Sequence, residues 1–368
     1  MFKFALAAAI SLALMFEPAV AEAKSKSKSS TSAVKRVKAK RVDTAKLIAA
    51  DNRQRMVRRV AVVRGKRKVM VLSARRAAPA LAVLTAGDMA GLNRTRDPLE
   101  LRSSVAYVMD QASSEVLFEK NANVALPIAS ITKLMTGLVV VQAQQDLDEV
   151  LTITEAEVDR HKYTSSRLAV GTRMTRANLL HIALMSSENR AAAALGRNYP
   201  GGINAFVAAM NAKAHELGMN DTHYVDSSGL SSQNVSSARD LAKLVTVAHQ
   251  EPLLRQYTTD PNYVVQAGNR SLQYSNTNYL VALPDWNIGL QKTGFINEAG
   301  RCLVMQAMIQ GRNVVMVFLD SKGKQSRTAD AGRMRRWLEA LKPAAIPAGA
   351  AAGVPVTVSA AAAGPVVH

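Results

Sequence analysis

The chain has 368 residues, of which 48% are hydrophobic and 20% charged, so it is not wholly disordered and can bury a sizeable core. Its single cysteine, Cys302, excludes an internal disulfide framework. The net charge of +19 is local, because residues 24–76 hold 19 basic and two acidic residues and leave 28 basic and 26 acidic residues elsewhere. The basicity therefore belongs to one segment, and the rest of the chain is nearly neutral.

Residues 1–23 have the order of a secretory signal peptide. Lys3 precedes an apolar run from Phe4 to Phe16, and small residues follow that allow cleavage after Ala21 or Ala23. The run is too short to span a bilayer permanently, so we favour a cleaved peptide over the alternative of an uncleaved anchor. The mature protein is therefore predicted to work in the periplasm.

Residues 24–99 are predicted to form a basic arm followed by a linker. The Lys-Ser repeats of residues 24–41 lack apolar surface to offset chain entropy, and we expect them to be disordered. The stretch Val60–Val71 mixes β-branched residues with arginine and lysine, which favours a strand on contact with a partner. Residues 77–99 are expected to be the linker. A +17 segment would bind nucleic acid, but export removes that partner, so we expect electrostatic contact with the anionic cell envelope.

Residues 100–341 are predicted to be the folded catalytic domain, with strands at both ends of a helical middle. This order favours an α+β fold, in which one antiparallel five-stranded sheet carries an inserted helical subdomain. The uncharged Ala/Pro-rich tail of residues 342–368, after Lys342, is expected to be disordered. The predicted strands are 104–110, 115–119, 286–292, 301–309 and 314–319, and the predicted helices are 130–143, 176–199, 203–217, 238–249 and a last amphipathic helix with Met334, Trp337, Leu338 and Leu341.

The first chemical motif is Ser130-Ile131-Thr132-Lys133. A serine followed three residues later by a lysine also occurs elsewhere in the chain, so the pattern alone is weak. Its context is stronger, because Pro127 leads into the motif and an apolar run follows, which predicts the first turn of a buried helix. Residues at i and i+3 share a helix face, so Lys133 should lie beside the Ser130 hydroxyl as in an activated nucleophile.

Two further motifs follow in order. Ser187-Glu188-Asn189 ends an apolar helical stretch and can supply a second hydroxyl and an amide. Lys292-Thr293-Gly294 lies on a predicted strand, where the glycine would let a substrate backbone approach the strand edge. A serine-x-x-lysine motif, a serine-x-asparagine motif and lysine-threonine-glycine, in this order, are the signature of penicillin-binding proteins and β-lactamases.

Longer segments of the chain resemble one family, the low-molecular-weight penicillin-binding proteins of the D-alanyl-D-alanine peptidase family, and within it the D-alanyl-D-alanine endopeptidase type. The resemblance covers about residues 100–341 and implies the serine β-lactamase/transpeptidase-like fold. The segments that carry it are 184–192, 210–214, 217–219, 286–288, 292–295 and 299–305.

The motifs suggest a catalytic role for three side chains. Ser130 is the predicted nucleophile, which forms an acyl-enzyme with the substrate carbonyl. Lys133 is the predicted base, provided that burial and the nearby charge of Lys292 lower its pKa. A solvated helix lysine is the alternative reading of Lys133. Ser187 is expected to relay a proton to the leaving nitrogen.

The remaining site residues are predicted to bind substrate. Asn189 should hydrogen-bond the peptide and steady Lys133, and Lys292, Thr293 and Gly294 should receive a carboxylate or polar backbone group. The resemblance implies an oxyanion hole made by the backbone N–H groups of Ser130 and Phe295.

Glu188 departs from the glycine or aspartate common in related enzymes. We expect its side chain to point away from its catalytic neighbours, into an ion pair with a helix arginine, with an acid/base role as the alternative. The six histidines show no metal-binding spacing, and neither a metal nor a cofactor is predicted. We interpret Cys302 as a packed thiol in a buried strand.

The favoured function is a serine D-alanyl-D-alanine endopeptidase that cleaves peptidoglycan cross-links, with β-lactam antibiotics as covalent inhibitors. A carboxypeptidase is the first alternative, but membrane-bound carboxypeptidases of the family carry an extra β-domain and an amphipathic anchor, and here only the uncharged tail follows Lys342. A serine β-lactamase is less favoured, because no Glu-x-x-Leu-Asn loop follows Ser187 to activate a deacylating water. A binding protein that acts through its basic arm is the alternative of a different class.

Overall fold

A computed structural model describes residues 57–63, 66–72, 83–268 and 270–341. The chain divides into two compact units, residues 1–78 and 79–368. In the first unit, β1 (Val57–Val63) and β2 (Lys66–Leu72) form an antiparallel hairpin, so the arm contains a strand pair within itself. The predicted signal peptide, the arm up to residue 56 and the tail of residues 342–368 lie outside the described residues.

The second unit is built on a five-stranded antiparallel sheet, which confirms the predicted α+β fold. The strand order is β11-β12-β13-β3-β4, so strands from the two ends of the unit meet where β13 pairs with β3. The strands are β3 (Ser103–Asp110), β4 (Val116–Lys120), β11 (Asn287–Ile296), β12 (Gly300–Ile309) and β13 (Arg312–Ser321).

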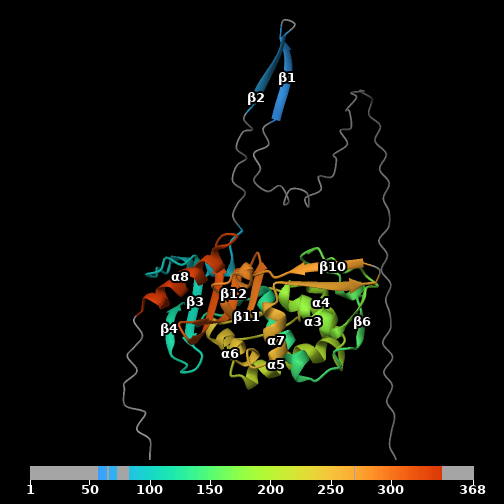
Figure 1. Ribbon diagram of the computed structural model, residues 1–368, viewed down its shortest axis with the longest axis vertical. Helices are drawn as coiled ribbons and strands as arrows, with labels where there is room; N and C mark the ends of the chain where they lie inside the picture. Colours follow the sequence, from blue (N-terminus) through green and yellow to red (C-terminus); the bar gives the residue numbers. More distant parts are fainter. Residues whose placement is uncertain (1–56, 64–65, 73–82, 269, 342–368) are drawn as a thin grey trace, which may run out of the picture. The chain divides into compact units, whose positions relative to one another are not determined.

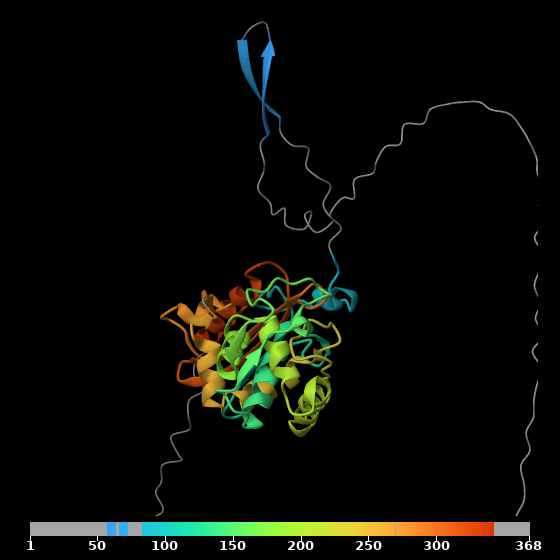
Figure 2. The same cartoon turned by 90° about the vertical axis from the view of Figure 1, so that its right-hand side faces the viewer.

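Helices α2 to α7 lie between β4 and β11 in sequence, α1 precedes β3, and α8 follows β13. Figure 1 shows α3, α4 and α5 gathered beside the sheet and α8 against it, and Figure 2 turns the helical part toward the viewer. None of the helices in the described ranges is long and apolar enough to cross a membrane. The α-helices are α1 (Ala86–Met89), α2 (Thr132–Gln142), α3 (Arg176–Met185), α4 (Asn189–Arg197), α5 (Gly202–Glu216), α6 (Ala238–Ala248), α7 (Pro252–Thr259) and α8 (Ser326–Ala340).

Short elements complete the unit. Three two-stranded pairs join β5 (Leu126–Pro127) to β8 (Val235–Ser236), β6 (Val150–Thr152) to β7 (Arg173–Thr175), and β9 (Asn262–Ala267) to β10 (Arg270–Ser275). The 3-10 helices are η2 (Leu92–Arg94), η3 (Ala129–Ile131), η4 (Glu155–Glu157) and η5 (Tyr279–Ala282).

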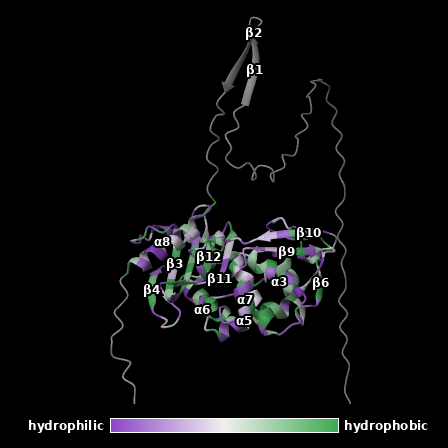
Figure 3. Cartoon of the chain, in the orientation of Figure 1, coloured by the Kyte–Doolittle hydropathy of each residue, from purple (hydrophilic) through white to green (hydrophobic). Residues whose placement is uncertain are grey.

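Both faces of the sheet are buried, and successive residues serve different faces. Val304 and Val317 belong to the larger cluster, which holds α2, α3 and α6. Their neighbours Met305 and Phe318 belong to a second cluster with Met334 of α8. Side chains alternate across a strand, so burial on both faces gives continuous apolar runs in the sequence. Figure 3 shows hydrophobic residues within the sheet and hydrophilic ones along α8 and β10.

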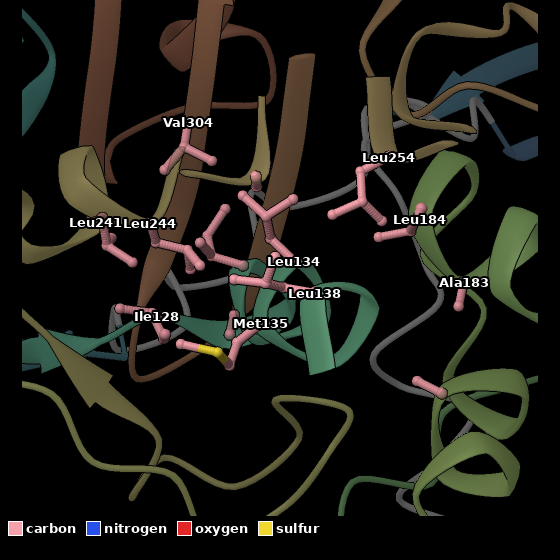
Figure 4. Packing of buried hydrophobic residues seen from close by; sticks show 14 of the residues in the cluster. Ile128, Leu134, Met135, Leu138, Ala183, Leu184, Leu241, Leu244, Leu254 and Val304 are labelled. Carbon is pink, nitrogen blue, oxygen red and sulfur yellow. The ribbon is translucent and has the colours of Figure 1, made fainter. Parts of the chain in front are cut away.

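The helix that carries the first motif is buried on all sides. Residues 132–140 of α2 are buried, and Leu134 and Leu138 pack among Leu244 and Val304 (Figure 4). A Cβ at Gly137 would lie 3.0 Å from Leu254 and 3.2 Å from Leu184, so α3 and α7 approach α2 closely there. This packing fixes the helix start, and with it Ser130 and Lys133, in a rigid frame.

The folded body begins earlier than the expected boundary at residue 100. Thr85 caps α1 with a capping box, and the Ala86 N–H donates to the Glu298 carbonyl at 2.8 Å. Lys322 lies 2.7 Å from Asp88, which ties the segment to the end of β13. The linker predicted for residues 77–99 is therefore packed structure from Thr85 onward, because it has partners that only the folded body supplies.

The single helix predicted for residues 176–199 is two helices. The chain breaks at Ser187, whose φ is +64°, and α4 starts afresh at Asn189. The apolar periodicity continues across the break, which is why the pattern did not reveal it. α7 and the β9–β10 hairpin were not predicted.

Candidate active site

Ser130 and Lys133 lie at the start of α2, as the motif predicts. Ser130 is in η3 directly before the helix, and the Lys133 Nζ lies 2.9 Å from its Oγ. The backbone before the serine is constrained, since Ala129 has a φ of +49°. A non-glycine residue in this region is held there by its surroundings, so the nucleophile position is set by packing.

The Lys133 amine is buried and surrounded by oxygen atoms. It lies 2.8 Å from the Asn189 Oδ1 and 2.6 Å from the Ser228 carbonyl, in addition to Ser130. Burial lowers its pKa to about 7, although the negative charges of Asp226 and Glu188 act in the opposite direction. The predicted lowering is therefore found with burial as its cause. A substantial fraction of the amine is neutral near pH 7 and can accept a proton.

A chain of hydrogen bonds holds Asn189 in its orientation. Its Nδ2 donates to the Thr164 Oγ1 at 3.2 Å, and the Thr164 hydroxyl donates to the Asp159 carboxylate at 2.8 Å. That carboxylate accepts three backbone N–H groups of its own loop, and these bonds lower its pKa to about 2 despite partial burial. Asn189 thus turns its oxygen toward Lys133.

Ser187 and Lys292 form a second hydroxyl–amine pair. The Lys292 Nζ donates to the Ser187 Oγ at 2.9 Å and to the Thr293 carbonyl at 2.9 Å. Lys292 is fully buried, and burial, with repulsion from Lys133 and Arg327, holds its pKa well below the usual value. The charge repulsion that we expected at Lys133 therefore acts chiefly on Lys292. A bound carboxylate would counter that burial and favour the ammonium form.

The third motif lies on β11, an edge strand of the described sheet. Thr293 shares a hydrogen bond of 2.6 Å with Thr277, and Phe295 is half exposed. A Cβ at Gly294 would lie 2.8 Å from the Ile128 carbonyl and 3.2 Å from the Ser130 nitrogen. We predicted that this glycine admits the substrate. In the structure it lets β11 approach the nucleophile loop, which places the backbone around Phe295 close to that of Ser130.

Three functional elements were not predicted from the sequence. The loop Asp226–Gly229 supplies the Ser228 carbonyl to Lys133, and its shape is held by Asp226, which accepts the N–H groups of Ser228 and Gly229. The signal was present in the polar Asp226-Ser227-Ser228-Gly229 run, which is typical of a tight turn. Arg327 of α8 donates to the Gly294 carbonyl at 2.7 Å and adds positive charge behind β11. No motif or periodicity in the sequence indicated that Thr164 belongs to the site.

The expectation for Glu188 was wrong, and the expectation for Cys302 is confirmed. Glu188 does not pair with a helix arginine in the described residues: it is the N-cap of α4 and accepts the N–H of Arg190, whose guanidinium donates to the Leu168 carbonyl. An N-cap carboxylate satisfies an otherwise unpaired helix N–H, which explains its inward position. Cys302 is fully buried in β12, and burial raises its pKa to about 11, as expected of a packed thiol.

The arrangement supports acyl transfer. It holds one hydroxyl beside an amine of lowered pKa, a second hydroxyl beside another amine, and an open strand edge next to both. These are the parts that a serine nucleophile, a proton relay and an extended peptide require.

Comparisons with known proteins agree with this chemistry. The chain is 52% identical to a D-alanyl-D-alanine endopeptidase of Pseudomonas aeruginosa over 255 residues, which cover 69% of this chain and 82% of the relative. It is 44% identical to a D-alanyl-D-alanine endopeptidase of Escherichia coli over 253 residues, 68% of this chain and 82% of the relative.

The fold has a solved counterpart. The crystal structure of the Streptomyces K15 DD-transpeptidase superposes with a TM-score of 0.62 at 28% identity, covering 67% of this chain and all of that one. The family model described as D-alanyl-D-alanine carboxypeptidase matches residues 92–323, a span that contains all three motifs. The resemblance noted in the sequence is thereby confirmed, and the chain belongs to the D-alanyl-D-alanine carboxypeptidase family of serine peptidases.

Proposed function

We propose that this enzyme is a D-alanyl-D-alanine endopeptidase that hydrolyses the peptide cross-links of peptidoglycan through an acyl-enzyme at Ser130. The observation that carries the chemistry is the contact of 2.9 Å between Ser130 and a buried Lys133 whose pKa is lowered to about 7. The cross-link is favoured as substrate because two relatives that match over two thirds of the chain are named endopeptidases.

The proposed reaction has two steps. Lys133 takes the proton of Ser130 as its oxygen attacks the carbonyl carbon of the scissile bond. The backbone N–H groups of Ser130 and Phe295 stabilise the oxyanion, and the C–N bond breaks. The proton held by Lys133 passes through Ser187 to the leaving amine, which leaves Lys133 neutral again. Water then attacks the ester, its proton returns through Lys133, and the free acid leaves a regenerated Ser130.

Substrate binding is assigned to β11 and its surroundings. An extended peptide can add to the free edge of β11, with Gly294 and Thr293 along it and Asn189 on the opposite wall. Arg327 provides positive charge behind β11, and a carboxylate bound beside the scissile bond would favour the ammonium form of Lys292. A β-lactam would acylate Ser130 in the same way, and slow hydrolysis of that ester would make it an inhibitor.

The test is a competition between two soluble substrates. Purified enzyme is given cross-linked dimeric muropeptides and monomeric pentapeptides, and products are identified by mass. We expect dimers to be cut to monomers faster than free D-alanine is released from pentapeptides. Preferential release of D-alanine would make the enzyme a carboxypeptidase.

Two variants assign the chemistry. Ser130→Ala should abolish both hydrolysis and labelling by a fluorescent penicillin, because the acyl group then has no acceptor. Lys133→Ala should slow labelling by orders of magnitude. Persistent labelling of a folded Ser130→Ala protein would remove Ser130 from the mechanism, and rapid release of the penicillin label from the wild type would favour a β-lactamase.

We further propose the division of the chain and its location. Residues 1–23 act as a cleaved signal peptide, and the enzyme works in the periplasm. The arm is an electrostatic tether to the anionic envelope. The observation that supports the tether is that the arm's described strands contain five basic and no acidic residues.

A further inference from the structure

An arginine-lined cleft shares one lining residue, Arg167, with the cavity at Ser187 and Asn189. It is a cavity of about 360 Å³ between the loop that precedes β7 and the tip of the β9–β10 hairpin. Arg167, Arg173 and Arg270 line it, and every other lining residue among those that the structure describes is uncharged. We call this cavity the arginine cleft. None of the three motifs contributes a residue to it.

The three arginines have no acidic partner in the described part of the chain. Arg167 donates to the Gln273 carbonyl and lies 3.7 Å over the Tyr274 ring, but neither contact neutralises its charge. Arg173 and Arg270 are exposed and make no ion pair among the described residues, whereas Arg176, three positions beyond Arg173, is paired with Glu149. Three unpaired guanidinium groups around one hollow attract an anion.

The arginine cleft is connected to the catalytic site by a shared residue. A second cavity of about 360 Å³ is lined by Ser165, Ser166 and Arg167 together with Ser186, Ser187, Glu188 and Asn189. Arg167 thus belongs to both cavities. A peptide whose scissile bond lies beside Ser187 can therefore extend past Arg167 into the arginine cleft. The one carboxylate of the second cavity, Glu188, is buried as the cap of α4.

The scaffold around the arginine cleft suits a binding site. The hairpin is anchored by Val265 and Tyr274, which are buried, and by the Tyr263 hydroxyl, which donates to the Asn178 Oδ1 at 2.6 Å. Figure 1 shows β10 running alongside the helical part of the unit. Arg270 therefore projects from an anchored hairpin, which limits the entropy lost when it binds a ligand.

We propose that the arginine cleft binds a free carboxylate of the peptide substrate, away from the scissile bond, and so selects carboxylate-bearing cross-linked peptides over their carboxamide forms. This inference rests on the proposed function, because it assigns a second contact to the same substrate. Arg173 and Arg270 are specificity residues and take no part in the bond-breaking step. Guanidinium groups suit the role, since they remain charged at any working pH and match a carboxylate in geometry.

The test uses two cross-linked dimers that differ only in one free carboxylate, present in one and converted to a carboxamide in the other. An exposed arginine–carboxylate pair shifts an equilibrium by about threefold, within an upper limit of about fivefold, so two such pairs multiply to about tenfold. We expect the wild type to cut the carboxylate form with a kcat/KM about tenfold higher. The variant Arg173→Ala/Arg270→Ala should reduce that preference to less than about twofold.

Two controls make the comparison specific. Arg336→Ala removes an exposed arginine of α8, outside both cavities, and should keep the tenfold preference. Arg173→Lys/Arg270→Lys should keep part of it, because the charge remains. Titration with a fluorescent penicillin counts active sites in each preparation, so a poorly folded variant is recognised.

The outcomes separate this inference from the proposed function. Equal cutting of both forms by the wild type, or a preference that survives in the double alanine variant, would overturn the role of the arginine cleft and leave the endopeptidase intact. If the wild type cuts neither dimer, the two forms are titrated against Ser130→Ala by fluorescence anisotropy. Tighter binding of the carboxylate form that depends on Arg173 and Arg270 supports the cleft, and equal binding overturns it.

Discussion

Gly229→Ala should damage acylation although the residue supplies no side chain to the site. Gly229 has a φ of +79°, and a Cβ there would lie 1.9 Å from the Ala129 carbonyl oxygen and 2.9 Å from the Thr132 Oγ1. Because real Cβ contacts are essentially never under 3.0 Å, the Ala129 backbone must move by about 1 Å. That backbone leads directly into Ser130.

The expected magnitude has two parts. The left-handed conformation alone costs an alanine about 1–2 kcal/mol, and overpacking adds about 1–3 kcal/mol. A displacement of about 1 Å near a nucleophile lowers the rate by about 10²-fold. Gly311 provides the matched control, because it has the same φ of +79° in the β12–β13 turn and a Cβ there meets nothing within 4 Å.

The assay is the second-order rate of labelling by a fluorescent penicillin, together with the melting temperature of each variant. Gly311→Ala should be less stable but should label at the wild-type rate. Gly229→Ala should be less stable still and label about 10²-fold more slowly. If the two variants label at rates within about threefold of each other, the close approach of Gly229 to Ala129 does not position the nucleophile.

Two further predictions follow from the electrostatics. The rate of penicillin acylation should rise about tenfold per pH unit below pH 7 and level off above it. The reason is that Lys133, with a pKa lowered to about 7, acts as a base only when neutral. A rate that keeps rising to pH 10 would show that the group has an ordinary lysine pKa. Deleting residues 24–76 should leave turnover of soluble muropeptides unchanged but weaken sedimentation with sacculi. The loss should be greatest at low salt, since exposed charges are screened within about 10 Å at 0.1 M salt. Equal sedimentation of the full-length and truncated proteins at every salt concentration would rule out a tether.

The sheet was predictable because the buried strands are continuous apolar runs in the sequence. Residues 301–309 and 314–319 are apolar on both faces, and the structure buries both. Ser130 and Lys133 were predictable as neighbours because three residues span one turn of a helix. These inferences are local, and local patterns are what a sequence displays.

Contacts between distant segments were not predictable. The Ser228 carbonyl reaches Lys133 across 95 positions, and a backbone carbonyl has no residue type by which to recognise it. The break at Ser187 is imposed by tertiary packing on a stretch whose periodicity favours a continuous helix. Likewise Thr85 and Asp88 are ordered by Lys322, more than 230 positions away.

The three oxygen atoms around Lys133 also determine the direction of the first proton transfer. A neutral amine has two N–H bonds and one lone pair, and the Ser228 carbonyl and the Asn189 Oδ1 can only accept. Both N–H bonds are therefore committed, and the lone pair faces the one remaining neighbour, the Ser130 hydroxyl, which must donate. When the amine gains a third proton, it donates a hydrogen bond to the serine oxygen, and the oxygen lone pair that would attack the substrate is then occupied by this bond. The protonation state of Lys133 thus determines whether Ser130 can act as a nucleophile, and the change requires no movement of the backbone.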